Sequence, residues 1–203
     1  MDVPRLHFTN SKNYSAPIHP NLLNELRERG WKLIKEIGRG NTNVAFLAEN
    51  NHIQSTVLIP TAQEYTDKNI NHIIKLQKEG KLLDVVEVYD WFYTESVVDK
   101  EELKIAIENE IVTYPDYVFN DGGYNIFIIE LLTPLTDYVN IDNIEQTLTS
   151  LYKDAWVQTD LHLGNFGYSA TNKLKVFDLE GLMENDDFTS FTRFINKLKT
   201  NKL

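Results

Sequence analysis

The sequence predicts an α+β fold in which a sheet comes first and helices gather after it. Three strand-like stretches separated by short turns occupy residues 31–61, which indicates an antiparallel meander. Apolar residues recur at helical spacing in residues 66–83 and 141–155. Because the strands and helices do not alternate regularly, the order favours α+β over a parallel α/β sheet.

The chain begins with a segment that has no clear periodicity. Residues 1–20 look irregular, because three prolines interrupt them. The first helix is expected over residues 21–30, with Asn21 as its cap and Gly30 at its end.

The other elements are assigned by alternation for strands, by spacings of three and four for helices, and by glycine and asparagine for turns. The segment 101–114 fits either a helix or a strand. The remaining expectations are strands at 31–40, 43–51, 55–61, 84–94 and 124–132, helices at 66–83, 141–155 and 188–200, a hairpin turn at 120–123, and a hairpin with a strand at 171–181.

Composition excludes several classes of function. The 203 residues include 30 acidic and 20 basic side chains, and a net charge of −10 disfavours nucleic-acid binding through a basic face. The chain has no cysteine, which excludes disulfides, thiolate nucleophiles and cysteine metal sites. No apolar run is long enough to span a membrane, and the N-terminus is unlike a signal peptide, so we expect a cytoplasmic protein.

One short segment concentrates polar groups in an apolar frame. Asp160-Leu-His162-Leu-Gly-Asn165 follows a helix and a buried stretch, and Asp178 stands thirteen positions after Asn165, at the end of a predicted strand. The hairpin between them is short enough to bring these groups together. Amide and carboxylate oxygens are ligands that Mg²⁺ prefers, and a separate carboxylate can accept a proton.

This segment resembles the catalytic loop and metal-binding aspartate of the protein-kinase-like superfamily, and is most similar to small-molecule kinases such as the aminoglycoside and choline kinases. The resemblance implies a bilobal fold, with an antiparallel-sheet N-lobe and a reduced helical C-lobe. The implied boundaries are 1–30 for an N-terminal extension, 31–132 for the N-lobe and 133–203 for a minimal C-lobe.

The resemblance also implies ATP and Mg²⁺ as nucleotide and metal. Asp160 would be the catalytic base, and Asn165 and Asp178 would be the metal ligands. His162 would brace the loop without touching substrate.

Further residues match the family with uneven strength. Gly38 and Gly40 resemble the glycine-rich loop that approaches phosphates, although the third glycine is missing. Backbone groups near Glu130 and Leu132 resemble the hinge that binds adenine. Glu79 lies about where the family has a helix glutamate.

The chain departs from the family in three places. The strand that should carry a phosphate-binding lysine has Leu58 or Pro60 at that position. Gln158 replaces the histidine that usually stands two residues before the catalytic aspartate. Only 25 residues follow Asp178, too few for a protein-substrate platform.

The sequence therefore leaves three functions open. The first is an atypical minimal kinase that transfers the ATP γ-phosphate to a hydroxyl acceptor. The second is a pseudokinase-like module that binds a nucleotide or a partner without transfer. The third is a metal-dependent hydrolase that uses Asp160, His162 and Asp178. A protein partner or a second copy is expected to cover the face that the reduced C-lobe leaves open.

Overall fold

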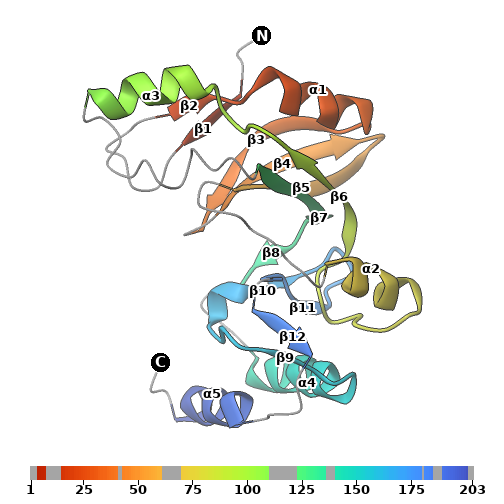
Figure 1. Ribbon diagram of the computed structural model, residues 1–203. Coiled ribbons are helices and arrows are strands. Elements are labelled where there is room, and N and C mark those ends of the chain that lie inside the picture. The colour runs from red at the N-terminus through yellow and green to blue at the C-terminus, as the bar shows by residue number, and fades with distance from the viewer. Residues whose placement is uncertain are drawn as a thin grey trace. The chain divides into compact units, whose positions relative to one another are not determined.

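The structure is a computed structural model that describes residues 4–7, 15–40, 43–60, 70–109, 123–135, 140–179, 181–184 and 189–200. In these ranges helices are mixed with antiparallel strands, which confirms the α+β class (Figure 1). No helix in the described ranges is long and apolar enough to cross a membrane.

The chain divides into two compact units. Unit 1 contains Met1–Thr66 and Val88–Ile129, and unit 2 contains Asp67–Glu87 and Glu130–Leu203. The segment 67–87 thus groups with the C-terminal part of the chain, whereas the boundaries taken from the sequence include it in 31–132.

The sheet of unit 1 contains the predicted meander. The first three strands pair antiparallel in sequence order. Along the second of them Val44, Phe46 and Ala48 are buried while the residues between them are half-buried, which is the period-two pattern of a strand. Among the described residues the strand order is β3 (Lys32–Arg39), β4 (Asn43–Asn50), β5 (Ile53–Pro60), β7 (Tyr124–Glu130) and β6 (Val88–Thr94).

Helix α1 (Pro20–Glu28) contributes Leu22 and Leu26 to the core of unit 1. Its cap is His19, whose Nδ1 accepts a hydrogen bond from the backbone N–H of Asn21. The prediction of Asn21 as the cap was therefore wrong. Pro20 suits the first helical turn, where no backbone N–H donor is needed. The helix therefore begins at Pro20, one residue before the predicted start at residue 21.

The N-terminal lead-in is more ordered than the sequence indicated. Strands β1 (Arg5–His7) and β2 (Ser15–Pro17) pair antiparallel, so the prediction of an irregular segment was wrong for these residues. Leu6 and Ala16 face each other in this pair and are fully buried. The prolines do not prevent it, because a short two-stranded ribbon needs few ladder hydrogen bonds.

The ambiguous segment 101–114 contains helix α3 (Lys100–Glu108). Asp99 caps it, since its Oδ1 accepts from the backbone N–H groups of Glu101 at 2.9 Å and Glu102 at 3.1 Å. Of the turn predicted at 120–123, only Gly123 lies within the described residues.

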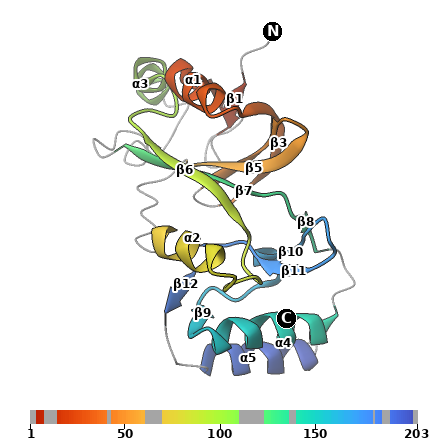
Figure 2. The ribbon, with the colours of Figure 1, turned by 90° about the vertical axis from the view of Figure 1, so that its right-hand side faces the viewer.

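Unit 2 contains helices around two small antiparallel sheets, and α4 and α5 lie side by side (Figure 2). Leu148 and Leu151 on α4 and Phe194 on α5 are buried. The helices are α2 (Ile70–Lys78), α4 (Ile141–Lys153) and α5 (Thr189–Lys199), and the sheets are β8 (Thr133–Pro134) with β10 (Phe166–Tyr168) and β11 (Leu174–Val176), and β9 (Trp156–Gln158) with β12 (Leu182–Glu184).

Hydrogen bonds to β11 explain why the segment after α2 belongs to unit 2. The Val86 N–H donates to Val176 O at 2.7 Å, and the Val176 N–H donates to Asp84 O at 2.8 Å. The strand predicted over 84–94 therefore begins only at Val88, because the residues before it pair with unit 2.

A buried hydroxyl in β5 gives a stability prediction. Ser55 is fully buried, and its Oγ has no hydrogen-bond partner among the described residues. Ser55→Ala is expected to raise the free energy of unfolding by about 1 kcal/mol, because it removes an unsatisfied polar group. Urea unfolding measures the change. Thr94→Val is the control: it removes a hydroxyl that donates to Ser96 O, and a loss of stability is expected there. Destabilisation by Ser55→Ala would contradict the prediction.

A buried tyrosine predicts a loss of stability at alkaline pH. Burial raises the pKa of the Tyr124 phenol from 10.0 to about 12. The unfolded chain therefore releases this proton at lower pH than the folded chain, so stability is unaffected below pH 10 and falls as pH rises toward 12. The expected loss is roughly 2–3 kcal/mol. Denaturant unfolding of wild type and Tyr124→Phe between pH 8 and 11.5 tests this, since the substitution should remove that part of the slope.

Candidate functional site

The candidate site of unit 2 lies where one loop leads into β10 and another leaves the neighbouring strand β11. Strands β10 and β11 form the predicted hairpin, with Phe166 paired to Val176. This register places the residues just before β10 beside those just after β11. The Phe177 N–H donates to Asn165 O at 3.0 Å, which ties the two loops together.

The side-chain amide of Asn165 joins the three predicted residues. Its Nδ2 donates to the backbone oxygen of Asp160 at 2.8 Å and to Asp178 Oδ2 at 3.2 Å. Both partners can only accept, so the nitrogen must face them, and both of its hydrogens are used. Asn165 is only 7% exposed, so the orientation of its amide is fixed. Its Oδ1 takes no part in these two hydrogen bonds.

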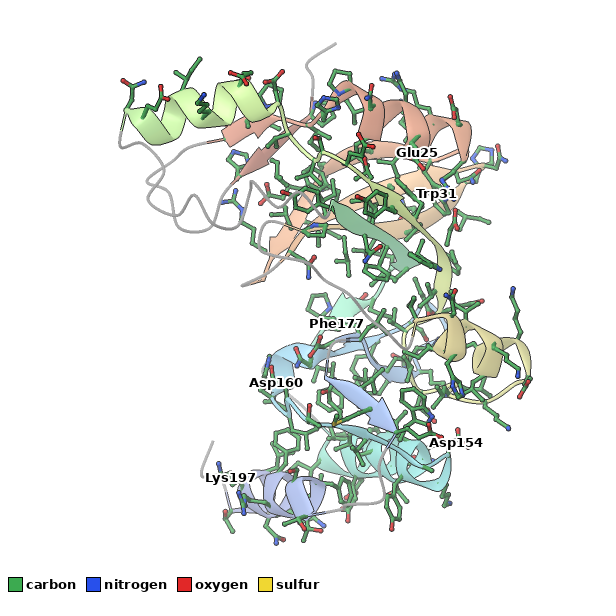
Figure 3. The ribbon with its side chains drawn as sticks, in the orientation of Figure 1. Glu25, Trp31, Asp154, Asp160, Phe177 and Lys197 are labelled. Carbon is green, nitrogen blue, oxygen red and sulfur yellow. The ribbon has the colours of Figure 1, made fainter. Side chains whose placement is uncertain are left out.

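The carboxylates of Asp160 and Asp178 differ in exposure. The Asp160 side chain is 69% exposed and lies at the surface of its loop (Figure 3). Asp178 is half-buried and contacts the Asn165 amide directly. One carboxylate is thus held against the loop, and the other is open to solvent.

His162 and Gly164 shape the turn between Asp160 and Asn165. The His162 carbonyl accepts from the Asn165 N–H at 3.1 Å, and its Nε2 lies 3.5 Å from Asp160 Oδ2. A Cβ on Gly164 would lie 2.8 Å from His162 Nδ1, so glycine leaves room for the ring. The contacts described for His162 all lie within this loop, and its side chain is 54% exposed.

Gln158 takes part in the site, although the sequence indicated it only as a missing histidine. It is 2% exposed. Its Nε2 donates to Asp178 O at 2.7 Å, and its Oε1 accepts from the Asp160 N–H at 3.0 Å. The sequence does place a polar residue at the end of a strand just before the loop, which could have indicated a role for Gln158. The sequence pattern does not reveal that this residue is buried.

Three aromatic residues flank the polar loop in the sequence. Trp156 and Phe166 are 2% and 1% exposed, and Tyr168 is half-buried. The Phe166 ring stacks on Phe194 of α5, with ring centroids 6.3 Å apart.

In unit 1, Gly38 and Gly40 lie at the tip of the β3–β4 hairpin. Among the described residues, a Cβ on Gly38 would meet nothing within 4 Å, and one on Gly40 would be 3.7 Å from Asn43 O. The described contacts do not require glycine at either position, which is compatible with an outside group that needs close access to the backbone.

The strand position of the missing lysine carries no positive charge. Leu58 pairs with Ala45 and Pro60 pairs with Asn43 on the neighbouring strand. Arg39, between the two glycines, forms an ion pair with Glu36.

Glu36 of this hairpin is also bound by His7, whose Nδ1 lies 2.8 Å from Glu36 Oε2. Although burial alone would raise the pKa of the Glu36 carboxyl, hydrogen bonds from Arg39 and His7 lower it below its ordinary value. Glu36 therefore stays ionised and holds Arg39.

Glu130 makes structural contacts in unit 2. Its N–H donates to Glu87 O at 2.8 Å. Its Oε2 lies 2.5 Å from Lys175 Nζ, and both side chains are largely buried. The predicted adenine contacts involve backbone groups and not the Glu130 side chain. Of the Glu130 backbone groups, the N–H is already bound, to Glu87 O.

The other two predicted nucleotide contacts differ in their surroundings. Leu132 packs over Gly167, where an added Cβ would lie 2.8 Å from Leu132 Cβ. The Glu79 side chain, just after α2, is 43% exposed and lies 3.6 Å from Lys81 Nζ. The contacts described for Glu79 do not join it to Asp160, Asn165 or Asp178.

The donor set fits a hard divalent ion better than a histidine-rich site. Asn165 and Asp178 together offer amide and carboxylate oxygens, the ligands typical of Mg²⁺. Within the described ranges, no group of three or more histidine, aspartate or glutamate side chains is placed to hold a metal ion.

Comparison with protein-family models and with curated proteins found no match for this chain.

Proposed function

We propose that this protein is a minimal, bilobal kinase-like phosphotransferase that moves the γ-phosphate of ATP to a hydroxyl acceptor. The Asn165 amide supports this proposal, because its nitrogen binds both Asp178 and the Asp160 backbone, and its Oδ1, which takes no part in these two bonds, is the atom assigned to the metal. One carboxylate, that of Asp178, is held by Asn165, and the other, that of Asp160, is open to solvent, which suits a metal ligand and a proton acceptor.

Each residue then has a separate task. Asn165 and Asp178 would hold Mg²⁺, which neutralises charge on the phosphates when bound. The acceptor oxygen bonds to the γ-phosphorus, the bond to the β,γ-bridging oxygen breaks, and ADP leaves. Asp160 takes the hydroxyl proton, and its exposed carboxylate is accessible to an acceptor from solvent.

The nucleotide contacts of the proposal use backbone groups. Gly38 and Gly40 would let N–H groups approach the phosphates. Since the Glu130 N–H already binds Glu87, adenine recognition is assigned to the Glu130 carbonyl and the Leu132 backbone. Glu79 keeps no assigned role, because its described ion pair is with Lys81.

A second candidate function is nucleotide binding without transfer. It is favoured by the uncharged Leu58 and Pro60, since a site without the lysine stabilises the transition state less. Arg39 does not replace that charge freely, because Glu36 already neutralises it.

Radiolabelled ATP with Mg²⁺ separates these functions. Wild type should turn over ATP or transfer label, and Asp178→Asn should not. Asp142→Asn, which changes an exposed carboxylate on α4 of the same unit, should behave as wild type. A nucleotide-dependent rise in melting temperature without turnover would favour the binding module. The absence of any response to nucleotide would contradict both functions.

A further inference from the structure

We infer that Gln158 is a positioning residue that sets the Mg²⁺ requirement of the site, an inference that rests on the proposed function. It touches neither metal nor acceptor in this assignment. Instead, the two ends of its amide bind the backbone of the two segments that carry the site. Its Nε2 holds Asp178 O at 2.7 Å and its Oε1 holds the Asp160 N–H at 3.0 Å.

The location of Gln158 makes this link rigid. The residue ends β9 and pairs with Leu182 of β12. At 2% exposure Gln158 is largely shielded from water, so solvent substitutes poorly for the two hydrogen bonds. A shift of this amide therefore moves the backbone of a metal ligand and of the base together.

Gly181 packs directly against this amide. A Cβ on Gly181 would lie 1.6 Å from Gln158 Oε1 and 2.5 Å from its Cδ, so no other residue fits while Gln158 stays in place. Gly181 O also accepts from the Thr159 N–H at 2.8 Å, which fixes the distance between the two strands.

Gln158 also lines a cavity of about 60 Å³ between α4, β9 and α5. Because this cavity adjoins the residue, Gly181→Ala is expected to displace the amide without unfolding the unit, and so to act like a change of Gln158 itself.

Groups that orient metal ligands typically change metal affinity or activity by about 10- to 100-fold when they are removed. Gln158→Met keeps the length of the side chain but loses both hydrogen bonds. We expect it to raise the Mg²⁺ concentration that half-saturates ATP binding by about 10- to 100-fold. Gly181→Ala should shift this concentration in the same direction.

The matched control is Gln77→Met in the same unit. Gln77 Nε2 also donates to a backbone carbonyl, that of Val86, at 2.9 Å. The Gln77→Met substitution also removes an amide-to-carbonyl hydrogen bond, but it is expected to leave the Mg²⁺ concentration for half-saturation unchanged. Gln77→Met therefore measures what the loss of an amide-to-carbonyl bond elsewhere in unit 2 does to the Mg²⁺ half-saturation.

Calorimetric titration of ATP at increasing Mg²⁺ is the measurement, with far-UV circular dichroism to verify folding. A shift in Gln158→Met and Gly181→Ala but not in Gln77→Met supports the inference. If Gln158→Met does not fold, the comparison of Gly181→Ala with Gln77→Met decides it. The inference about Gln158 would be overturned if the folded variants reached half-saturation at the wild-type Mg²⁺ concentration, or if Gln77→Met shifted that concentration equally. Either result would leave the proposed function standing. Wild type that binds no ATP at any Mg²⁺ concentration would overturn the proposed function, and this inference with it.

Discussion

Asp160→Asn is expected to lower phosphotransfer by about 10²- to 10⁴-fold, the usual contribution of a positioned proton acceptor. The substitution keeps the size and polarity of the side chain but removes its basicity. The loop should keep its shape, because Asn165 binds the backbone oxygen of residue 160 and not its carboxylate. Gln158 likewise binds only the backbone N–H there.

Nucleotide binding should separate Asp160 from the metal ligands. Since the carboxylate of Asp160 is 69% exposed and is not the one that contacts Asn165, Asp160→Asn should change the ATP dissociation constant in Mg²⁺ less than threefold. Steady-state kcat and calorimetric Kd measure the two effects. Unchanged turnover, or a loss of ATP affinity as large as that of Asp178→Asn, would show that the roles are assigned incorrectly.

Phe166→Ala is expected to lower the free energy of unfolding by about 3–5 kcal/mol, the range for removing a large buried ring. Phe166 is 1% exposed, directly follows Asn165 and stacks on Phe194. The loss combines apolar transfer, a cavity next to the loop and the stacked pair. Because the site depends on a rigid backing, the variant should also lose Mg²⁺-dependent ATP binding.

Two substitutions calibrate this effect. Phe166→Leu keeps most of the apolar volume and should cost less than half as much. Tyr152→Ala changes an aromatic side chain of α4 that is 37% exposed, and it should therefore cost clearly less than Phe166→Ala. Urea unfolding monitored by circular dichroism gives all three values. A loss for Phe166→Ala no larger than that for Tyr152→Ala would contradict the packing role of the ring.

The elements that the sequence predicted well are those whose periodicity reflects burial. Alternation in β4 and amphipathic spacing in α4 come directly from one face packing on a core. The spacing between Asn165 and Asp178 also predicted a hairpin, and the side chains do meet across it. Local pattern was sufficient in these cases because the contact partners are close in sequence.

What the sequence could not provide are contacts between distant segments. Residues 84–87 have strand-like composition, but the backbone groups of Asp84 and Val86 hydrogen-bond to Val176 in β11, about ninety positions further on. The buried pair of Glu130 and Lys175 depends on the same kind of distant contact. The bridging role of Gln158 was missed because a glutamine at the end of a strand is usually exposed, and only its packing against Gly181 shows otherwise.

Paramagnetic broadening tests most directly whether Asn165 and Asp178 bind a nucleotide-associated divalent ion. Mn²⁺ shares the oxygen-ligand preference of Mg²⁺ and broadens nearby resonances. In ¹⁵N-labelled protein, substoichiometric Mn²⁺–ATP should therefore abolish the backbone amide signals of Phe166 and Phe177, whereas Mg²⁺–ATP should only shift them. Asp178→Asn should retain both signals. Persistence of these signals in wild type, or equal broadening in Asp178→Asn, would contradict the account.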